Sequence, residues 1–203
     1  PNPSEFIQPA VYVCRHHNVK GPILSLAYLP IAVRPWVYHV FMQRASCYRH
    51  CADYTFSKRF GWHRASARAV AWVIAPAFAR LLRSAGGIPV HRGSAHLMGT
   101  FRLSADALAR GESLLVFPDV DYTSQVGDTG ALYEGFLLLD RMYHKRTGGH
   151  IAFVPLHISD ARRALYLGEP ARFDDGVPYD VGRARVLEAL KGEMNRLSIR
   201  YGE

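Results

Sequence analysis

The chain contains little cysteine and little lysine. The first argues against one class of protein, the disulfide-stabilised domain, and the second bears on the kind of partner that the protein binds. Three cysteines among 203 residues are an odd number, which argues against a disulfide framework and favours a reducing compartment. Only four of the 25 basic residues are lysines, and the rest are arginines, whose planar guanidinium suits phosphate. The net charge of +8 therefore indicates an anionic partner: nucleic acid, a phospholipid headgroup or a phosphorylated metabolite. A genome rich in G and C explains the arginine bias equally well.

Long uninterrupted apolar runs are also missing. Residues 22–43 are apolar and aromatic, but prolines and charged or polar side chains break them, so they do not reach the ~20 apolar residues of a membrane-spanning helix. Two interpretations remain open for this stretch. It forms a pair of core helices, or it lies on a membrane surface through Leu29, Trp36, Val37, Tyr38 and Phe41. The chain begins at Pro1 without methionine, so we expect a processed protein or an excised piece.

Several well-known motifs are absent. The sequence has no P-loop, no dinucleotide-binding fingerprint and no Gly-x-Ser-x-Gly elbow. It has no zinc finger, RNP pattern or Gly-x-x-Gly clamp either, which argues against nucleic acid as the partner despite a pI of about 9.6. Cys47, His50 and Cys51 would share a helix face, but a structural zinc site needs four ligands. We therefore expect small buried thiols, no metal and no organic cofactor.

What is present is an alternation of strands and helices. The patterns predict strands at 10–14, 87–93, 113–117, 150–158 and near 164–168. They predict helices at 64–87, from Ser104 to before Gly111, at 129–149, and an amphipathic one at 182–200. This order predicts an α/β fold: one domain over 1–203, with a largely parallel sheet flanked by helices on both faces.

Three polar loops follow three of the predicted strands. They are "RHHN" at 15–18, "HRGS" at 91–94 and "PDVDYTS" at 118–124. In open α/β sheets, ligands bind at the carboxyl ends of the strands, so we expect these loops to converge. A histidine after one strand and an arginine after another fit general-base catalysis on a substrate that carries phosphate.

The order and spacing of four blocks resemble the glycerolipid acyltransferases, which acylate lysophosphatidic acid and related glycerol phosphates. "HHNVKG" places His16 at the histidine of the first block, and "GGIPVHRG" matches Gly-x-Ile-x-Val-x-Arg. "VFPDVDYTS" matches Phe-Pro-Glu-Gly-Thr in part, and Val154-Pro155 matches a Val-Pro that ends a strand. The resemblance covers roughly residues 10–160, and 161–203 would add a strand and the amphipathic helix.

The resemblance implies a role for each matched position. His16 would be the general base, and Arg92 would bind the phosphate of the acceptor. Asp119 would take the place of the family's glutamate. The implied substrate-binding residues are Asn18, Gly87, Arg92, Gly93, Phe117, Pro118, Asp121 and Pro155.

The chain departs from the family pattern at one important position. The aspartate expected five residues after His16 is Gly21. In the third block, Val120 and Asp121 replace Gly and Thr. Because the missing carboxylate would steady the imidazolium, another group must replace it, and Asp119 is the first choice. Asp121, Glu134 and a backbone carbonyl are the alternatives.

The resemblance predicts transfer of a fatty acyl group from acyl-CoA or acyl-carrier protein to the hydroxyl of lysophosphatidic acid or a similar glycerol phosphate, in phospholipid biosynthesis. The expected partners are the thioester donor, the lysophospholipid acceptor and an anionic membrane surface, without nucleic acid. We expect a cytoplasmic protein, peripheral on the inner membrane. The alternative is a catalytically weak or silent member of the same fold that binds lipid or an acyl carrier.

Overall fold

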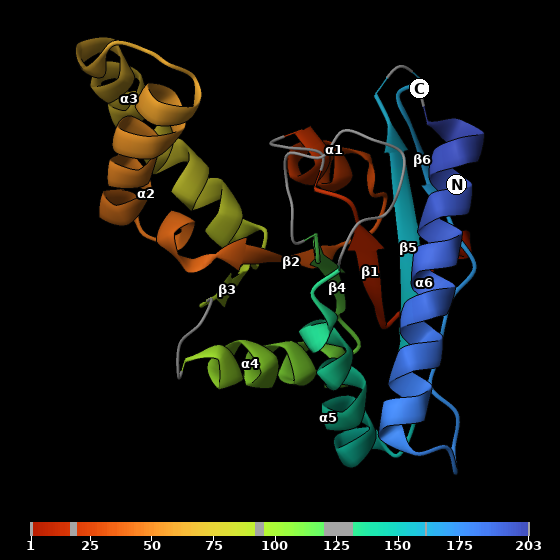
Figure 1. Cartoon of the computed structure of the whole chain (residues 1–203). Helices are drawn as coiled ribbons and strands as arrows, with labels where there is room; N and C mark the ends of the chain where they lie inside the picture. The colour runs from red at the N-terminus through yellow and green to blue at the C-terminus, as the bar shows by residue number, and fades with distance from the viewer. Residues whose placement is uncertain (1, 17–19, 92–95, 120–131, 161, 203) are drawn as a thin grey trace. The chain divides into compact units, whose positions relative to one another are not determined.

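A computed structural model describes residues 2–16, 20–91, 96–119, 132–160 and 162–202 (Figure 1). The chain divides into two compact units. Pro1–Val33 and Phe101–Glu203 form what we call the sheet unit, and Arg34–Thr100 form the helical unit. Asn18, Arg92, Gly93 and Asp121, four of the predicted site residues, lie outside the described residues. We describe each unit by itself.

The sheet unit contains four neighbouring strands in the order β4-β1-β5-β6. Their bounds are Ala10–Cys14 for β1, Ser113–Val116 for β4, Ala152–Ser159 for β5 and Ala164–Leu167 for β6. β1 is parallel to both β4 and β5, and only β6 is antiparallel. Every residue of β1 is buried, as expected for a central parallel strand with an unbroken apolar run. The prediction of an α/β fold with a largely parallel sheet is confirmed.

Helices cover both faces of this sheet. Tyr12 lies on the face that packs with Leu26 and Leu29, within and just after α1 (Lys20–Tyr28). On the other face, Phe153 contacts Phe136 of a 3₁₀ turn (Glu134–Leu137), which leads into α5 (Leu138–Thr147). α6 (Tyr179–Tyr201) packs on β5 and buries the apolar positions expected from its periodicity, namely Val186, Leu187, Leu190, Met194 and Leu197.

The helical unit consists mainly of helices that lie, along the chain, between the two strands of one short parallel pair. β2 (Val33–Tyr38) pairs with β3 (Ile88–Val90). Between them lie a 3₁₀ turn (His39–Met42), α2 (Arg44–His50), a π-helical segment (Cys51–Arg59) and α3 (Arg64–Ser84). Cys47 and Cys51 are buried, and all three cysteines are free thiols, as predicted.

The long helix α3 buries a row of four alanines and leaves several of its large apolar side chains exposed. Ala67, Ala71, Ala75 and Ala79 are fully buried, and the last three pack on the cluster around Cys47 and Cys51. The neighbouring positions Trp72, Val73, Ile74 and Leu81 are 44–66% exposed. Arg64–Ser84 is long and apolar enough to cross a membrane by length and composition, with 28% of its apolar window buried. An ordinary core helix turns its large apolar side chains inward, so this arrangement requires a separate explanation.

Three details of the sequence-based prediction are wrong. Residues 22–43 do not form a pair of core helices, because α1 ends at Tyr28 and β2 begins at Val33. Ser104 does not open its helix, because α4 (Leu97–Ala109) begins seven residues earlier and buries Ser104 completely. Pro155 does not end its strand, because β5 continues to Ser159.

The packing of α3 predicts an unusual pair of mutational effects. Ala75→Leu adds volume to a fully packed contact and is expected to lower the free energy of unfolding by about 1–3 kcal/mol. Ile74→Ala, at the adjacent exposed position, is expected to change it by less than about 0.5 kcal/mol. Urea denaturation of both variants measures the difference. A larger loss for Ile74→Ala would contradict the orientation of α3.

Candidate active site

His16 and Asp119 meet at one edge of the sheet. β1 ends at Cys14 and β4 at Val116, and the two strands are parallel neighbours, so the residues that follow them leave at the same edge. Asp119 Oδ2 accepts a hydrogen bond from the backbone N–H of His16. Residues 103 positions apart in the chain are thus in direct contact, which brings together two of the three predicted loops; of the third, at 91–94, only His91 lies within the described residues.

The aromatic ring of Phe117 helps to position the imidazole. The two ring centroids lie 5.6 Å apart with an interplanar angle of 73°, an edge-to-face arrangement. His16 is half-buried and Phe117 packs at the rim of the core. Pro118 is buried between Phe117 and Asp119. Four of the predicted site residues, His16, Phe117, Pro118 and Asp119, therefore form one group.

Asp119 is held from a second direction. Pro118 O accepts a 2.7 Å hydrogen bond from Tyr133 N, and Asp119 forms an antiparallel bridge with Leu132. The carboxylate thus stands on backbone that is fixed by pairing, and its position beside His16 does not depend on its side chain alone. Glu134, an alternative replacement for the missing carboxylate, is exposed at the start of the 3₁₀ turn.

The position of the missing aspartate has no room for a side chain. A Cβ built on Gly21 would lie 2.3 Å from His16 O and 2.7 Å from Arg15 O, both backbone atoms. α1 therefore begins directly against the end of β1, and only glycine permits this approach. An aspartate at residue 21 would force the β1–α1 connection apart, so the replacement carboxylate must come from elsewhere, and Asp119 is already there.

The thiol of Cys14 lies beneath this group but has no nucleophilic role. Burial raises the pKa of Cys14 to about 12, the charge of Asp119 adds to the rise, and a hydrogen bond with Ser25 opposes it. Ser25 Oγ donates to Gly21 O at 2.6 Å and lies 3.6 Å from Cys14 Sγ. The thiol is therefore protonated near neutral pH, and the pair serves to fix the first turn of α1 against β1.

The other two described site residues have structural explanations of their own. Gly87 belongs to the helical unit, where a Cβ would lie 2.8 Å from Leu82 O and 3.1 Å from Val37 Cγ2. Pro155 is buried inside β5, paired in register with Val13. Packing therefore accounts for both positions, whichever substrate the protein takes.

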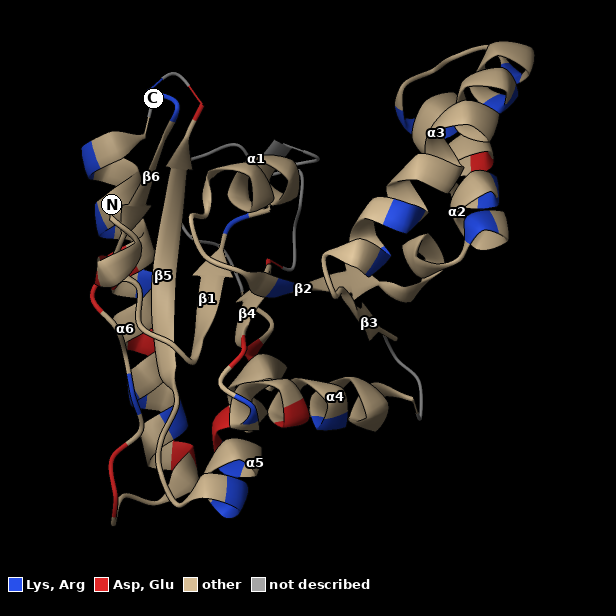
Figure 2. Cartoon of the chain, turned by 180° about the vertical axis from the view of Figure 1, so that it is seen from behind, with Lys and Arg blue, Asp and Glu red and all other residues tan. Residues whose placement is uncertain are grey.

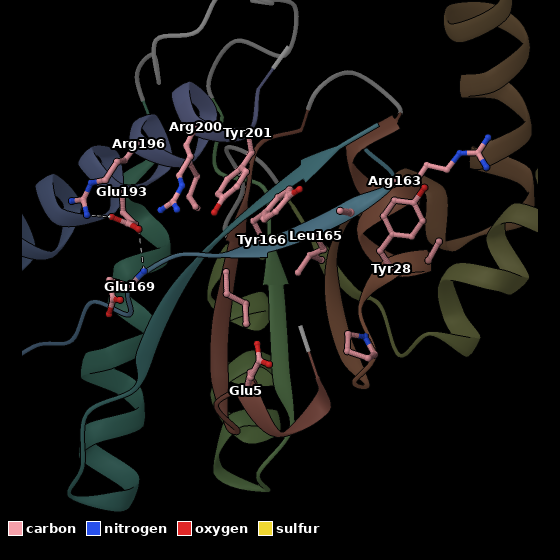
Figure 3. A pocket seen from close by; sticks show the side chains of 15 residues that line it. Glu5, Tyr28, Arg163, Leu165, Tyr166, Glu169, Glu193, Arg196, Arg200 and Tyr201 are labelled. Carbon is pink, nitrogen blue, oxygen red and sulfur yellow. Dashed lines mark hydrogen bonds and ion pairs between the residues drawn. The ribbon is translucent and has the colours of Figure 1, made fainter. Parts of the chain in front are cut away.

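A cavity of about 920 Å³ lies elsewhere in the sheet unit, along the edge strand β6 (Figure 3). Tyr166 and Tyr201 stack in it with centroids 3.7 Å apart, and Arg196 pairs with Glu193 at 2.8 Å. None of the predicted site residues lines it. No sequence motif indicates this cavity, because its arginines and glutamates come from α6, from the residues on either side of β6 and from the N-terminal segment. With three of each sign (Arg163, Arg196, Arg200; Glu5, Glu169, Glu193), it has no preference for one ligand charge.

Comparison of the chain with protein-family models, with curated proteins and with solved structures gives no match.

The close approach at Gly21 predicts a steric effect with a built-in control. Gly21→Ala and Gly21→Asp are each expected to lower the free energy of unfolding by about 1–3 kcal/mol, because the new Cβ meets backbone atoms that cannot rotate away. Gly192→Ala in α6, where a Cβ meets nothing within 4 Å, is expected to raise it by roughly 0.5–1 kcal/mol through helix propensity. Chemical denaturation compares the three. Equal stability of Gly21→Ala and the wild type would refute the steric account.

Proposed function

We propose that the protein is an acyltransferase that moves a fatty acyl group from a thioester, acyl-CoA or acyl-carrier protein, to the hydroxyl of lysophosphatidic acid or a similar glycerol phosphate. The observation that carries the proposal is the contact of Asp119 with His16 at the carboxyl ends of β1 and β4. A histidine and a carboxylate at this edge of a parallel sheet are in the position where α/β enzymes do their chemistry.

The proposed reaction needs only one proton acceptor. A neutral imidazole nitrogen of His16 takes the proton from the acceptor hydroxyl as that oxygen attacks the thioester carbonyl carbon. The tetrahedral intermediate then expels the thiolate, which takes the proton from the imidazolium and leaves as thiol. The negative charge of Asp119 favours the imidazolium that forms between the two steps. Arg92, outside the described residues, keeps its proposed role of binding the phosphate of the acceptor.

One observation favours the second candidate, a weak or silent member that binds lipid or an acyl carrier. Asp119 accepts a hydrogen bond from the backbone N–H of His16, whereas the carboxylate of a catalytic triad orients its histidine through a ring nitrogen. In a serine protease, neutralising the equivalent carboxylate lowers the rate about 10⁴-fold. The turnover of the wild-type protein therefore separates the two candidates.

The charge of the chain supports a membrane as the place of action. The helical unit contains ten of the 25 lysines and arginines but only Asp53 as an acidic residue. The rest of the chain has 15 basic and 16 acidic residues, so the helical unit accounts for the whole positive excess. Figure 2 shows blue bands along α2 and α3 with little red between them. Anionic lipid headgroups attract such a concentration of charge.

The apolar surface of the helical unit supports the same partner. Trp72 is 66% exposed, Val73 65% and Leu81 59%, on a helix with Arg64 and Arg68 at one end and Arg80 and Arg83 at the other. Exposed tryptophan and aliphatic side chains flanked by arginines are typical of helices that lie in the membrane interface. We therefore propose that the protein binds peripherally to an anionic bilayer through α3, on the cytoplasmic face of the inner membrane, where its lipid acceptor resides.

The enzymatic part is tested with the purified chain, lysophosphatidic acid and a panel of acyl-CoA and acyl-carrier-protein donors, with products identified by mass spectrometry. We expect turnover by the wild type, a loss of about 10²–10⁴-fold in His16→Ala because the general base is removed, and a smaller loss in Asp119→Asn. His96→Ala, an exposed histidine of the helical unit, should keep full activity. Full activity of His16→Ala would rule the assignment out, and binding of an acyl carrier without turnover would favour the silent candidate.

The membrane part is tested by flotation with vesicles of phosphatidylglycerol or of phosphatidylcholine. The wild type should bind the anionic vesicles, and binding should weaken as salt screens the charges. The double variant Trp72→Ala/Leu81→Ala should bind these vesicles with an affinity at least about tenfold lower, since two large apolar side chains no longer enter the bilayer. Ile199→Ala, 83% exposed on α6, is the matched control and should bind as the wild type does. Equal loss in both variants would contradict a role for α3.

A further inference from the structure

A second group of histidines and carboxylates lies in the sheet unit, apart from the proposed active site. It combines His144 of α5, His150 just before β5, and Asp175 in the turn that precedes α6. One potential ligand atom from each residue lies within 4.8 Å of the other two. The spacing of these residues in the sequence follows no metal-binding motif, and only the fold brings them together.

His150 is held by a buried carboxylate on one side. Asp140 is 2% exposed, its Oδ2 lies 2.8 Å from His150 Nδ1, and its Oδ1 accepts from Ile151 N at 3.0 Å. A carboxylate only accepts hydrogen bonds, so the Nδ1 of His150 carries the proton that it donates to Asp140. In a neutral imidazole this leaves the lone pair on Nε2.

That second nitrogen faces the rest of the group. His150 Nε2 lies 3.3 Å from Asp175 Oδ1. With Nδ1 carrying the proton, two acceptors face each other at this distance, which is unfavourable unless a cation lies between them. The ring of His144 stacks on that of His150, with centroids 4.5 Å apart, and its Nδ1 is buried without a hydrogen-bond partner.

We propose that His144, His150 and Asp175 bind a divalent transition metal ion, with Zn²⁺ as the best fit, and that Asp140 orients His150 for it. A set of two imidazoles and one carboxylate suits Zn²⁺ better than the hard cations Mg²⁺ and Ca²⁺, which take oxygen ligands. A buried carboxylate on the distal nitrogen of a ligating histidine is the usual outer partner of such sites. Water would complete the coordination.

The geometry needs a small adjustment that the site permits. Zinc bonds of about 2.0–2.1 Å place tetrahedral ligand atoms roughly 3.3 Å apart, so the atoms now separated by up to 4.8 Å must close in. Asp175 is 88% exposed, so solvent surrounds most of its side chain and leaves room for it to move closer to the two rings. The His144 ring must turn out of its stacked position, because the lone pair of an imidazole lies in the plane of its ring.

The location indicates what such a site would do. β5 is parallel to β1, so the segment before β5 lies at the opposite edge of the sheet from His16. Figure 1 shows α5 at one end of the sheet unit and α1 at the other. A metal ion here would link α5, the start of β5 and the segment before α6, so its effect would be on stability, independently of the proposed acyl transfer.

The experiment uses the full chain, stripped with a chelator and titrated with ZnCl₂ against a chromophoric zinc indicator. We expect one equivalent of zinc to bind and to raise the melting temperature. Asp140→Asn should weaken binding about 10–100-fold, since it releases the orientation of His150. His150→Ala, His144→Ala and Asp175→Asn should each weaken it at least as much. Because Asp140 is buried, circular dichroism must show that its variant folds, and the exposed Asp175 provides the test if it does not.

A control variant shows whether the cysteines of the helical unit, rather than this site, bind the zinc. Cys47→Ala/Cys51→Ala removes the two thiols of the helical unit and should leave zinc affinity unchanged. A wild-type chain that binds no zinc would overturn the proposal, as would Asp175→Asn and His144→Ala chains that bind it like the wild type. His150 would then be a protonated imidazole bridging Asp140 and Asp175.

Discussion

The structure depends on β1 being fixed between two parallel neighbours. Its register with β4 and β5 aligns Val13 with Val116 on one side and with Pro155 on the other. Because all five of its residues are buried, a shift of register would expose apolar side chains, and the alignment is strongly specified. The residues after β1 and β4 must therefore leave the sheet at the same edge. The contact of His16 with Asp119 follows from this alignment.

The same constraint explains why the chain departs from the family that it resembles. α1 starts so close to the end of β1 that Gly21 meets the backbone of Arg15 and His16. An aspartate at residue 21 could not be accommodated unless α1 moved away from the end of β1. A carboxylate beside His16 must then come from the neighbouring strand, and Asp119 occupies that place. Gly21 and Asp119 thus belong to one arrangement, in which the glycine lets α1 start against the end of β1 and the carboxylate beside His16 comes from the residues after β4.

Elements with a clear local pattern could be predicted from the sequence. Elements whose pattern is interrupted, and contacts that depend on how distant elements pack, could not. The runs at 10–14 and 113–117 were found because burial on both faces leaves an unbroken apolar run, and the helix at 182–200 because burial on one face leaves a clear periodicity. β2 was missed although Val33, Pro35 and Val37 are buried and alternate with more exposed residues, because the prolines and the polar residues Arg34 and His39 suggested a pair of interrupted helices. The contact of His16 with Asp119 was predictable from strand order alone. The grouping of His144, His150 and Asp175 was not, because it depends on how α5 and the segment before α6 pack at the start of β5.

Charge and exposed apolar side chains are distributed unevenly between the two units, which averages over the whole chain do not show. A net charge of +8 spread evenly would carry little information, but all of it belongs to the helical unit, and the sheet unit is close to neutral. Among the residues of the helical unit that the structure describes, nine large apolar side chains are exposed, including Trp72 and Leu81 on the helix that buries four of its alanines. A chain that only needed to fold would gain stability by exchanging these positions, since burying large side chains yields more than burying alanines. The observed arrangement is therefore costly in water, and this cost is the observation behind the proposed binding of α3 to an anionic bilayer.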